Sequence, residues 1–141
     1  MREHLVNLAL KLVGCPYVWG GANPWTGLDC SGFVIWLYQV FGLLPSGDWT
    51  AQGLFDHFDP KAGEPGGGSS RGDLVFYGGG EQCITHVMLA LGNELVVGAS
   101  GGDHTTTTLE EARRRGAQVK VKPLTYRADL LGVLSVSFPG E

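Results

Sequence analysis

The hydrophobic pattern of this 141-residue chain changes from helical to strand-like near residue 72. Before that point, apolar residues recur at spacings of three and four, which is typical of amphipathic helices. After it, short apolar segments are separated by glycines and polar residues, which is typical of strands. Helices followed by a run of antiparallel strands predict an α+β domain, with the N-terminal helices packed on a central antiparallel sheet. No internal linker is long enough to divide the chain, so residues 1–141 are predicted to form one domain.

Caps and helix breakers set the expected bounds of each element. Helices are predicted over residues 2–13, 30–41 and 50–57, followed by a Pro/Gly/Ser-rich loop over 59–71. Strands are predicted over residues 73–77, 85–91, 94–100, 117–124 and 129–138, with a short helical turn over 109–115. Gly92-Asn93 stands where a tight hairpin turn joins the second of these strands to the third.

Composition and charge exclude several classes of partner. The formal net charge is −4, so the chain lacks the basic footprint of a nucleic-acid binder or of a protein that binds anionic membranes. No stretch approaches the ~20 apolar residues that span a bilayer. The first residues are amphipathic and carry charges, unlike a signal peptide. We therefore expect synthesis in the cytoplasm and, for any action outside the cell, release by a route other than a cleaved signal.

The stretch LDCSGF, residues 28–33, places Cys30 at the predicted start of a helix. A helix N-terminus presents unpaired N–H groups and a partial positive charge, which favour an anion there. A cysteine in that position is expected to have a lowered pKa and to react as a thiolate. The alternative is that Cys30 is a small packing residue, as many free cysteines are. Its position alone leaves both interpretations open.

A nucleophilic thiol needs a base, and His86 is the best placed of the four histidines. It stands near the start of a predicted strand that is otherwise apolar, so a partner is expected to compensate for it. The alternative is a core histidine whose hydrogen bonds are satisfied. A cysteine on a helix followed by a histidine on a strand is compatible with a Cys-His hydrolase of the papain-like plan.

Four segments in order resemble the successive motifs of the NlpC/P60 family of bacterial cell-wall cysteine peptidases. They are YVWGG (17–21), LDCSGF (28–33), GDLVFY (72–77) and THV (85–87). The resemblance covers roughly two-thirds of the chain, from the first helix to about Ser100. It implies a papain-like fold and hydrolysis of peptide bonds in peptidoglycan stem peptides, with no metal and no other cofactor. The partner it implies is a peptidoglycan peptide, and the protein is expected to be a monomer.

The resemblance also assigns roles to individual residues. Cys30 is the implied nucleophile, His86 the general base, and Tyr17 the hydroxyl that helps to hold the oxyanion. The backbone N–H of Cys30 is a natural second oxyanion donor, because a helix start leaves it unpaired. Three further residues are predicted to contact substrate: Trp19, Asp29 and Ser31. Asp29 has a second interpretation, which we prefer, as the residue that caps the helix.

The third catalytic position departs from the family pattern. The family usually carries a polar residue, often histidine, on the strand after the base, and the matching residue here is Gly98. Across a hairpin that turns at Gly92-Asn93, Gly98 or Ala99 is expected to face His86. Either a Cys30–His86 dyad acts alone, or the orienting group comes from the segment SGGDH, residues 100–104. Between the two candidates there, His104 is favoured over Asp103. A solvated loop residue is the alternative for His104.

Three other functions compete with this one. A zinc site would draw on Cys15, Cys30, Cys83 and His86, although only Cys83 and His86 are closely spaced, and Cys15 and Cys83 are better interpreted as small apolar residues. A non-catalytic wall-binding module would keep the fold without the chemistry. An amidase or acyltransferase would use the same dyad on another amide or ester. The absent signal peptide favours a bacteriophage enzyme, delivered with phage tail proteins or released by lysis, over a domain excised from a larger exported protein.

Overall fold

The computed structural model describes residues 1–62 and 70–140, and residues 63–69 and 141 lie outside the described part. Its helices are α1 (Arg2–Lys11), α2 (Cys30–Val40), α3 (Ala51–Ala62) and α4 (Leu109–Arg115). Its strands are β1 (Ala22–Asn23), β2 (Gly27–Leu28), β3 (Leu74–Gly80), β4 (Cys83–Gly92), β5 (Leu95–Ser100), β6 (Gln118–Pro123) and β7 (Leu130–Leu134). The order of helices before strands agrees with the prediction from the hydrophobic pattern.

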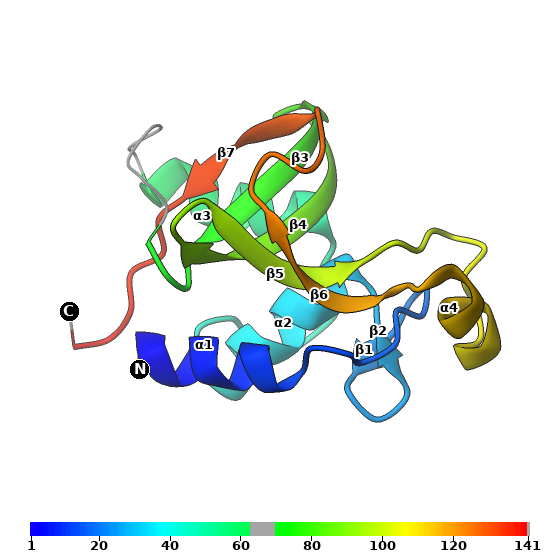
Figure 1. Ribbon diagram of the computed structural model, residues 1–141. Helices are drawn as coiled ribbons and strands as arrows, with labels where there is room; N and C mark the ends of the chain where they lie inside the picture. The colour runs from blue at the N-terminus through cyan, green and yellow to red at the C-terminus, as the bar shows by residue number, and fades with distance from the viewer. Residues whose placement is uncertain (63–69, 141) are drawn as a thin grey trace.

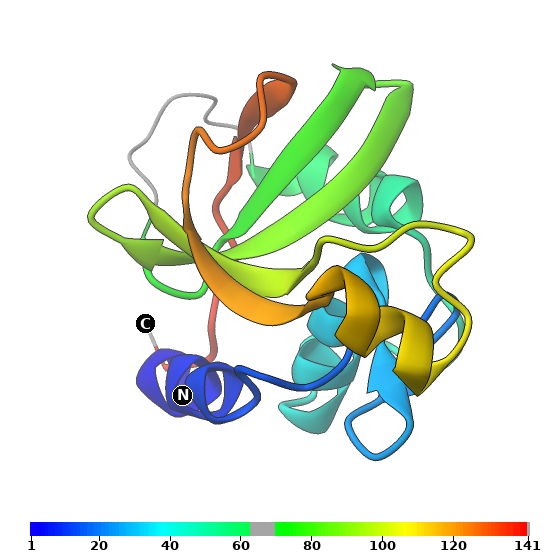
Figure 2. The ribbon, with the colours of Figure 1, turned by 45° about the vertical axis from the view of Figure 1, so that its right-hand side comes forward.

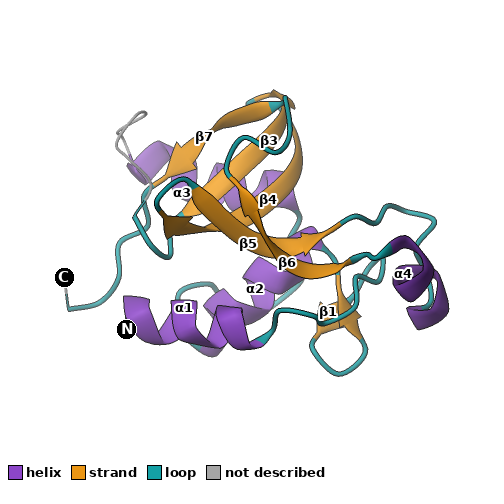
Figure 3. Ribbon diagram, in the orientation of Figure 1, coloured by secondary structure: helices purple, strands orange, loops and turns teal. Residues whose placement is uncertain are grey.

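The main sheet is antiparallel and has the strand order β6-β5-β4-β3-β7 (Figure 1). The helices α1, α2 and α3 pack against one of its faces (Figure 3). The larger core lies between these two layers, because apolar residues at helical spacing on the helices meet alternate residues of the strands. The predicted α+β architecture, with helices on a central antiparallel sheet, is confirmed.

Three local predictions were wrong in detail. The third helix continues to Ala62, so residues 59–62 belong to α3, and residues 63–69 of the predicted loop lie outside the described residues. The segment 15–28, predicted as loop throughout, contains the small hairpin β1–β2. The turn between β4 and β5 falls one residue later than predicted, on Asn93 and Glu94 with φ of 53° and 61°. Two successive positive φ angles are what a two-residue hairpin loop of type I′ requires.

A second, smaller core lies on the face of the sheet away from the helices. It contains Val75, Tyr77, Met88, Ala90 and Val96. The chain between β6 and β7 covers this core as it crosses from one edge of the sheet to the other (Figure 2). Because β6 and β7 are the two edge strands, this connection has to pass over the strands between them. The crossing segment brings Tyr126 to His86, near the start of β4.

Among the helices of the described residues, none has the length and hydropathy needed to cross a bilayer.

Candidate active site

The start of α2 is built by Asp29 as its N-cap. The Asp29 backbone is extended, with φ −88° and ψ −174°, and Oδ1 accepts a hydrogen bond of 2.7 Å from the backbone N–H of Gly32. Its other oxygen, Oδ2, accepts one of 3.0 Å from the backbone N–H of Gly20. The capping interpretation of Asp29 is therefore confirmed. Both carboxylate oxygens are held by backbone groups, so Cys30 begins the helix in a fixed place.

Two glycines allow the aromatic loop 15–28 to pack directly on this helix start. A Cβ atom built on Gly32 would collide with the carbonyl oxygen of Gly21, and one built on Gly21 would lie 2.7 Å from the carbonyl oxygen of Val18. The same carbonyl of Gly21 accepts a hydrogen bond of 3.2 Å from the backbone N–H of Asp29. A larger side chain at Gly32 would push the loop away from the helix start, and one at Gly21 would collide with the backbone of the loop itself.

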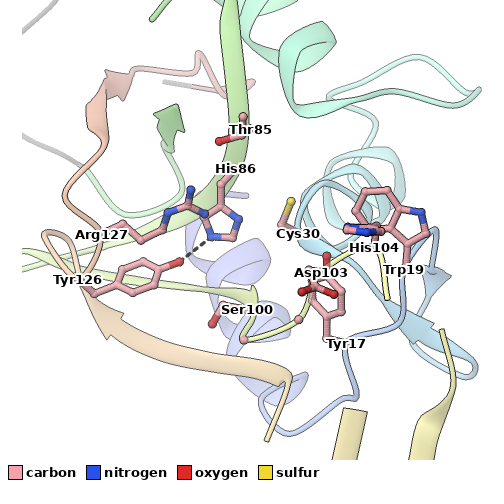
Figure 4. A pocket seen from close by; sticks show the side chains of 12 residues that line it. Tyr17, Trp19, Cys30, Thr85, His86, Ser100, Asp103, His104, Tyr126 and Arg127 are labelled. Carbon is pink, nitrogen blue, oxygen red and sulfur yellow. Dashed lines mark hydrogen bonds between the residues drawn. The ribbon is translucent and has the colours of Figure 1, made fainter. Parts of the chain in front are cut away.

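A cavity of about 300 Å³ opens at the start of α2 (Figure 4). Five structural segments contribute its walls: the aromatic loop, the start of α2, the beginning of β4, the end of β5 with the loop after it, and the β6–β7 connection. The lining residues are Tyr17, Trp19, Cys30, Thr85, His86, Ser100, Gly101, Gly102, Asp103, His104, Tyr126 and Arg127.

The structure brings five of the seven predicted site residues to this one cavity: Tyr17, Trp19, Cys30, His86 and His104. The other two, Asp29 and Ser31, line a neighbouring cavity of about 280 Å³ on the far side of the helix start. Ser31 Oγ donates a long hydrogen bond of 3.4 Å to Asp29 Oδ1. Residues that lie 11 to 74 positions from Cys30 in the sequence thus line the same cavity as Cys30, which the linear spacing alone does not require.

His86 lies at the cavity wall and is only 5% exposed. Its Nε2 shares a hydrogen bond of 2.6 Å with the hydroxyl of Tyr126. Burial, and then the positive charge of Arg127, lower the pKa of His86 to about 3, against a smaller raising effect of Asp129. The imidazole is therefore neutral at neutral pH and is able to accept a proton.

The expected lowering of the Cys30 pKa is wrong. Burial, and then the negative charge of Asp29, raise the pKa of the Cys30 thiol to about 11. The backbone N–H groups of Val87 and Ser31 and the charge of Arg127 lower it, but by less. The helix start does favour the thiolate, as predicted from sequence, yet the loss of water around the sulfur outweighs it. The resting pair is a neutral thiol and a neutral imidazole.

Tyr17 is buried on the opposite side of Cys30 from His86 (Figure 4). Its ring packs on Gly102, where a Cβ atom would collide with it. Burial, and then the negative charges of Cys30, Asp29 and Asp103, raise the pKa of the Tyr17 hydroxyl well above its usual range. The hydroxyl therefore keeps its proton and remains a hydrogen-bond donor at the cavity wall.

The loop after β5 does not bring His104 to His86. The ring of His104 is exposed and packs edge-to-face on Trp19, with ring centroids 6.2 Å apart. Asp103 accepts hydrogen bonds within its own loop and pairs with Arg115 at 3.1 Å. His86 instead has its partner in Tyr126, so the geometry favours Tyr126 over His104 as the group that orients the ring.

Tyr126 and Arg127 were not singled out in the sequence. They lie in TYRA, residues 125–128, between two predicted strands, where polar residues are ordinary. Arg127 forms a two-point ion pair with Asp129, with nitrogen–oxygen distances of 2.9 and 2.7 Å. Only the sheet topology could have indicated these two residues. The segment that joins the two edge strands, β6 and β7, crosses one face of the sheet and so passes over the strand that carries His86.

The other cysteines lie away from this cavity. Cys15 is half-buried against the larger core, as predicted for a small apolar residue. Cys83 is exposed at the start of β4, so its interpretation as a packing residue was wrong. Within residues 1–62 and 70–140, no three His, Cys, Asp or Glu side chains gather in a group that could hold a metal ion.

The NlpC/P60 family model matches residues 14–122, which include the aromatic loop, α2 and the strands around the cavity. The chain belongs to the NlpC/P60 family. The resemblance inferred from four short motifs is thereby confirmed, and with it the papain-like α+β fold.

Two curated relatives of this NlpC/P60 chain carry endopeptidase names. It is 40% identical over 94 residues to the bifunctional muramidase/DL-endopeptidase CwlT of Bacillus subtilis, covering 64% of this chain and 27% of that protein. It is 38% identical over 116 residues to the peptidoglycan endopeptidase RipB of Mycobacterium tuberculosis, covering 70% of this chain and 43% of that protein. The chain thus spans less than half the length of either relative.

Solved NlpC/P60 structures share the whole fold. The structure of RipB from Mycobacterium tuberculosis superimposes with a TM-score of 0.69 and 27% identity, over 97% of this chain and 65% of that one. The structure of RipD from the same organism, described as a non-catalytic domain adapted to peptidoglycan binding, has a TM-score of 0.64 and 17% identity, over 96% of this chain and 97% of that one. At that identity RipD shows the likeness of the fold alone.

Proposed function

We propose that this domain is a cysteine peptidase that hydrolyses a peptide bond in the stem peptides of bacterial peptidoglycan. The observation that carries the proposal is that Cys30 and His86 line one cavity together with the protonated hydroxyl of Tyr17. The endopeptidase names of CwlT and RipB support the substrate class. No cofactor takes part in the reaction.

The reaction begins with a proton transfer inside the neutral pair. His86 accepts the proton of the Cys30 thiol, and the thiolate sulfur attacks the carbonyl carbon of the scissile amide. Because burial raises the pKa of Cys30 and lowers that of His86, the neutral pair is favoured before the proton transfer. The imidazolium then gives its proton to the amine that leaves, and a thioester remains on Cys30.

Two donors receive the negative charge that develops on the substrate oxygen. One is the backbone N–H of Cys30, which has no helical partner because the residue is the first of α2. The other is the Tyr17 hydroxyl. Donors aimed at a developing oxyanion in a site shielded from water contribute one of the larger parts of a catalytic effect. A water molecule, deprotonated by His86, then hydrolyses the thioester and regenerates the thiol.

Of the three predicted substrate contacts, Trp19 alone lies at the rim of this cavity. Trp19 is 54% exposed there, with its ring set against His104, and offers a rigid apolar surface to a bound peptide. Asp29 and Ser31 face the neighbouring cavity, so any contact they make with substrate is on the other side of the helix start. Both carboxylate oxygens of Asp29 already accept backbone hydrogen bonds.

The test is a digest of purified peptidoglycan from several chemotypes, with the products identified by mass spectrometry. We expect new free amine and carboxyl ends within the stem peptide, at one type of bond, and intact glycan strands. Products with a cleaved bond between sugar and peptide would identify an amidase instead. Binding to sacculi without any cleavage would identify a wall-binding module and contradict the proposal.

Replacing Tyr17 with phenylalanine is expected to lower kcat by roughly 10²- to 10³-fold and to leave KM nearly unchanged. The ring stays packed on Gly102, while the hydroxyl that donates to the oxyanion is lost. Because an oxyanion donor acts mainly in the transition state, the loss of this hydrogen bond is expected to lower kcat and not to raise KM. Steady-state kinetics on a defined stem peptide measures both constants. A change confined to KM would make Tyr17 a contact of the ground-state substrate.

A further inference from the structure

At position 98 of β5, where the family carries the residue that orients the base, the side chain of Met88 from β4 occupies the space. Val97 pairs with Leu89 across β4 and β5, which sets Gly98 against Met88 rather than against His86. A Cβ atom at Gly98 would lie 2.5 Å from the sulfur of Met88 and 3.3 Å from its Cε atom. The prediction that Gly98 or Ala99 faces His86 was therefore wrong in register. Gly98 therefore has no side chain with which to orient the imidazole of His86.

The β6–β7 connection is anchored on both sides of the site. The backbone N–H of Leu124 donates to the Glu94 carbonyl at 2.7 Å, and the Leu124 carbonyl accepts a hydrogen bond of 2.8 Å from the Tyr77 hydroxyl. Farther along, the Asp129 carbonyl accepts a hydrogen bond of 3.0 Å from the backbone N–H of Gly78. These contacts fix Tyr126 between two attachment points, so its hydroxyl has a defined place.

The ring of Tyr126 is held by packing as well as by its backbone. Its centroid lies 5.6 Å from that of Tyr77, in an edge-to-face arrangement, and Tyr77 in turn lies 5.4 Å from the ring of His86. Lys122 places its ammonium group 5.8 Å from the centroid of the Tyr126 ring. A hydrogen-bonding group whose ring is locked in this way can fix the orientation of its partner.

We propose that Tyr126 is the positioning residue of His86, supplying from the β6–β7 connection the hydrogen bond that the residue at position 98 does not provide. The inference rests on the proposed Cys30–His86 chemistry. With Nε2 held at 2.6 Å by the Tyr126 hydroxyl, the second ring nitrogen is turned to the side of the cavity where Cys30 lies (Figure 4). The ring is thus held in the orientation that lets it take the thiol proton.

A tyrosine hydroxyl suits both protonation states of the base. When His86 receives a proton from Cys30, both ring nitrogens carry hydrogen, and the Nε2–H donates to the Tyr126 oxygen. Burial raises the pKa of Tyr126 to about 12, so the hydroxyl stays neutral and holds the ring without adding a charge. This differs from a carboxylate partner, which would also stabilise the imidazolium electrostatically.

An ion pair between Arg127 and Asp129 lies beside this contact. Arg127 lowers the pKa of His86 and Asp129 raises it. A side-chain hydrogen bond from Arg127 also acts to lower the pKa of Tyr126, although burial dominates. Because Asp129 holds Arg127 at two points, the guanidinium is fixed beside the Tyr126 hydroxyl and helps to hold it.

The test replaces Tyr126 with phenylalanine in the full chain, which removes the hydroxyl and keeps the ring that packs on Tyr77. We expect kcat to fall roughly 3- to 10-fold, the effect of one neutral hydrogen bond, with KM changed by less than about twofold. Tyr38→Phe is the matched control, because its fully buried hydroxyl bonds to the Gly72 carbonyl away from the cavity. The control is expected to change thermal stability and to leave kcat at the wild-type value.

A nuclear magnetic resonance measurement separates positioning from a structural role and needs no substrate. In protein with ¹⁵N-labelled histidine, we expect a slowly exchanging Nε2 hydrogen on His86 in the wild type and in Tyr38→Phe, and its loss in Tyr126→Phe. An unchanged imidazole signal, wild-type turnover, or an effect confined to KM in Tyr126→Phe would overturn the proposal. A wild type that cleaves no peptidoglycan would instead contradict the proposed function, while the imidazole signal would still decide the role of Tyr126.

Discussion

Cys30→Ala is expected to abolish peptidoglycan hydrolysis, with turnover falling by about 10⁴-fold or more. The substitution removes the only atom that forms a bond to the substrate in the proposed reaction. No neighbouring group replaces it, because Cys15 packs against the core and Cys83 lies at the exposed start of β4. Hydrolysis of a stem peptide by wild type and variant, followed by chromatography of the products, measures the loss.

Two controls separate chemistry from folding in this experiment. Cys83→Ala removes an exposed thiol and is expected to retain full turnover. The thermal stability of Cys30→Ala is expected to stay close to that of the wild type, because the cap formed by Asp29 and the glycine contacts at the helix start do not involve the sulfur. Residual turnover within about tenfold of the wild type in a folded Cys30→Ala variant would rule out Cys30 as the nucleophile.

His86→Gln is expected to lower kcat by about 10²- to 10⁴-fold, the usual contribution of a general base. The effect is large here because burial raises the pKa of the Cys30 thiol to about 11, so few molecules carry the thiolate at neutral pH without a base. His4→Gln is the control, since His4 is exposed on α1, and it is expected to keep full turnover. Equal turnover in His86→Gln and the wild type would contradict the assignment of the base.

The same variant tests the environment of His86 through the pH dependence of stability. The folded protein keeps the imidazole neutral down to a pKa of about 3, while the unfolded chain binds its proton below about pH 6.5. The unfolded state thus binds more protons between these values, so this residue makes stability fall on acidification by about 1.4 kcal/mol per pH unit. Urea unfolding at pH 7 and at pH 4.5 is expected to show a smaller loss in His86→Gln than in the wild type. An equal loss in both would mean that His86 titrates normally in the folded state.

The part of the site that could be predicted from the sequence depends on local patterns. Cys30 could be placed at a helix start because the cap residue, the glycine and the apolar periodicity lie within a few residues of it. His86 could be identified because a polar residue interrupts an apolar strand. The close approach of the aromatic loop to the helix is seen at Gly32, where a Cβ atom would collide with the Gly21 carbonyl oxygen, and a Cβ atom at Gly20 would meet no neighbour.

The remainder depends on register and burial, which local patterns do not contain. The β4–β5 turn lies one residue later than predicted, so Gly98 faces Met88. Tyr126 reaches His86 only because the connection between the two edge strands crosses the sheet, and no spacing in the sequence records that path. The sign of the Cys30 pKa shift was wrong because the helix start is visible in the sequence, whereas the loss of solvent around the sulfur is a property of the folded chain.

The most direct test of the central claim is a covalent label shaped like the substrate. A stem-peptide fragment released in the digest is converted at its new carboxyl end to a chloromethyl ketone, and the labelled protein is mapped by mass spectrometry. We predict one equivalent of label on Cys30, loss of activity in step with labelling, and protection by uncleaved stem peptide. Label on Cys15 or Cys83, or full activity in protein already labelled at Cys30, would contradict the account.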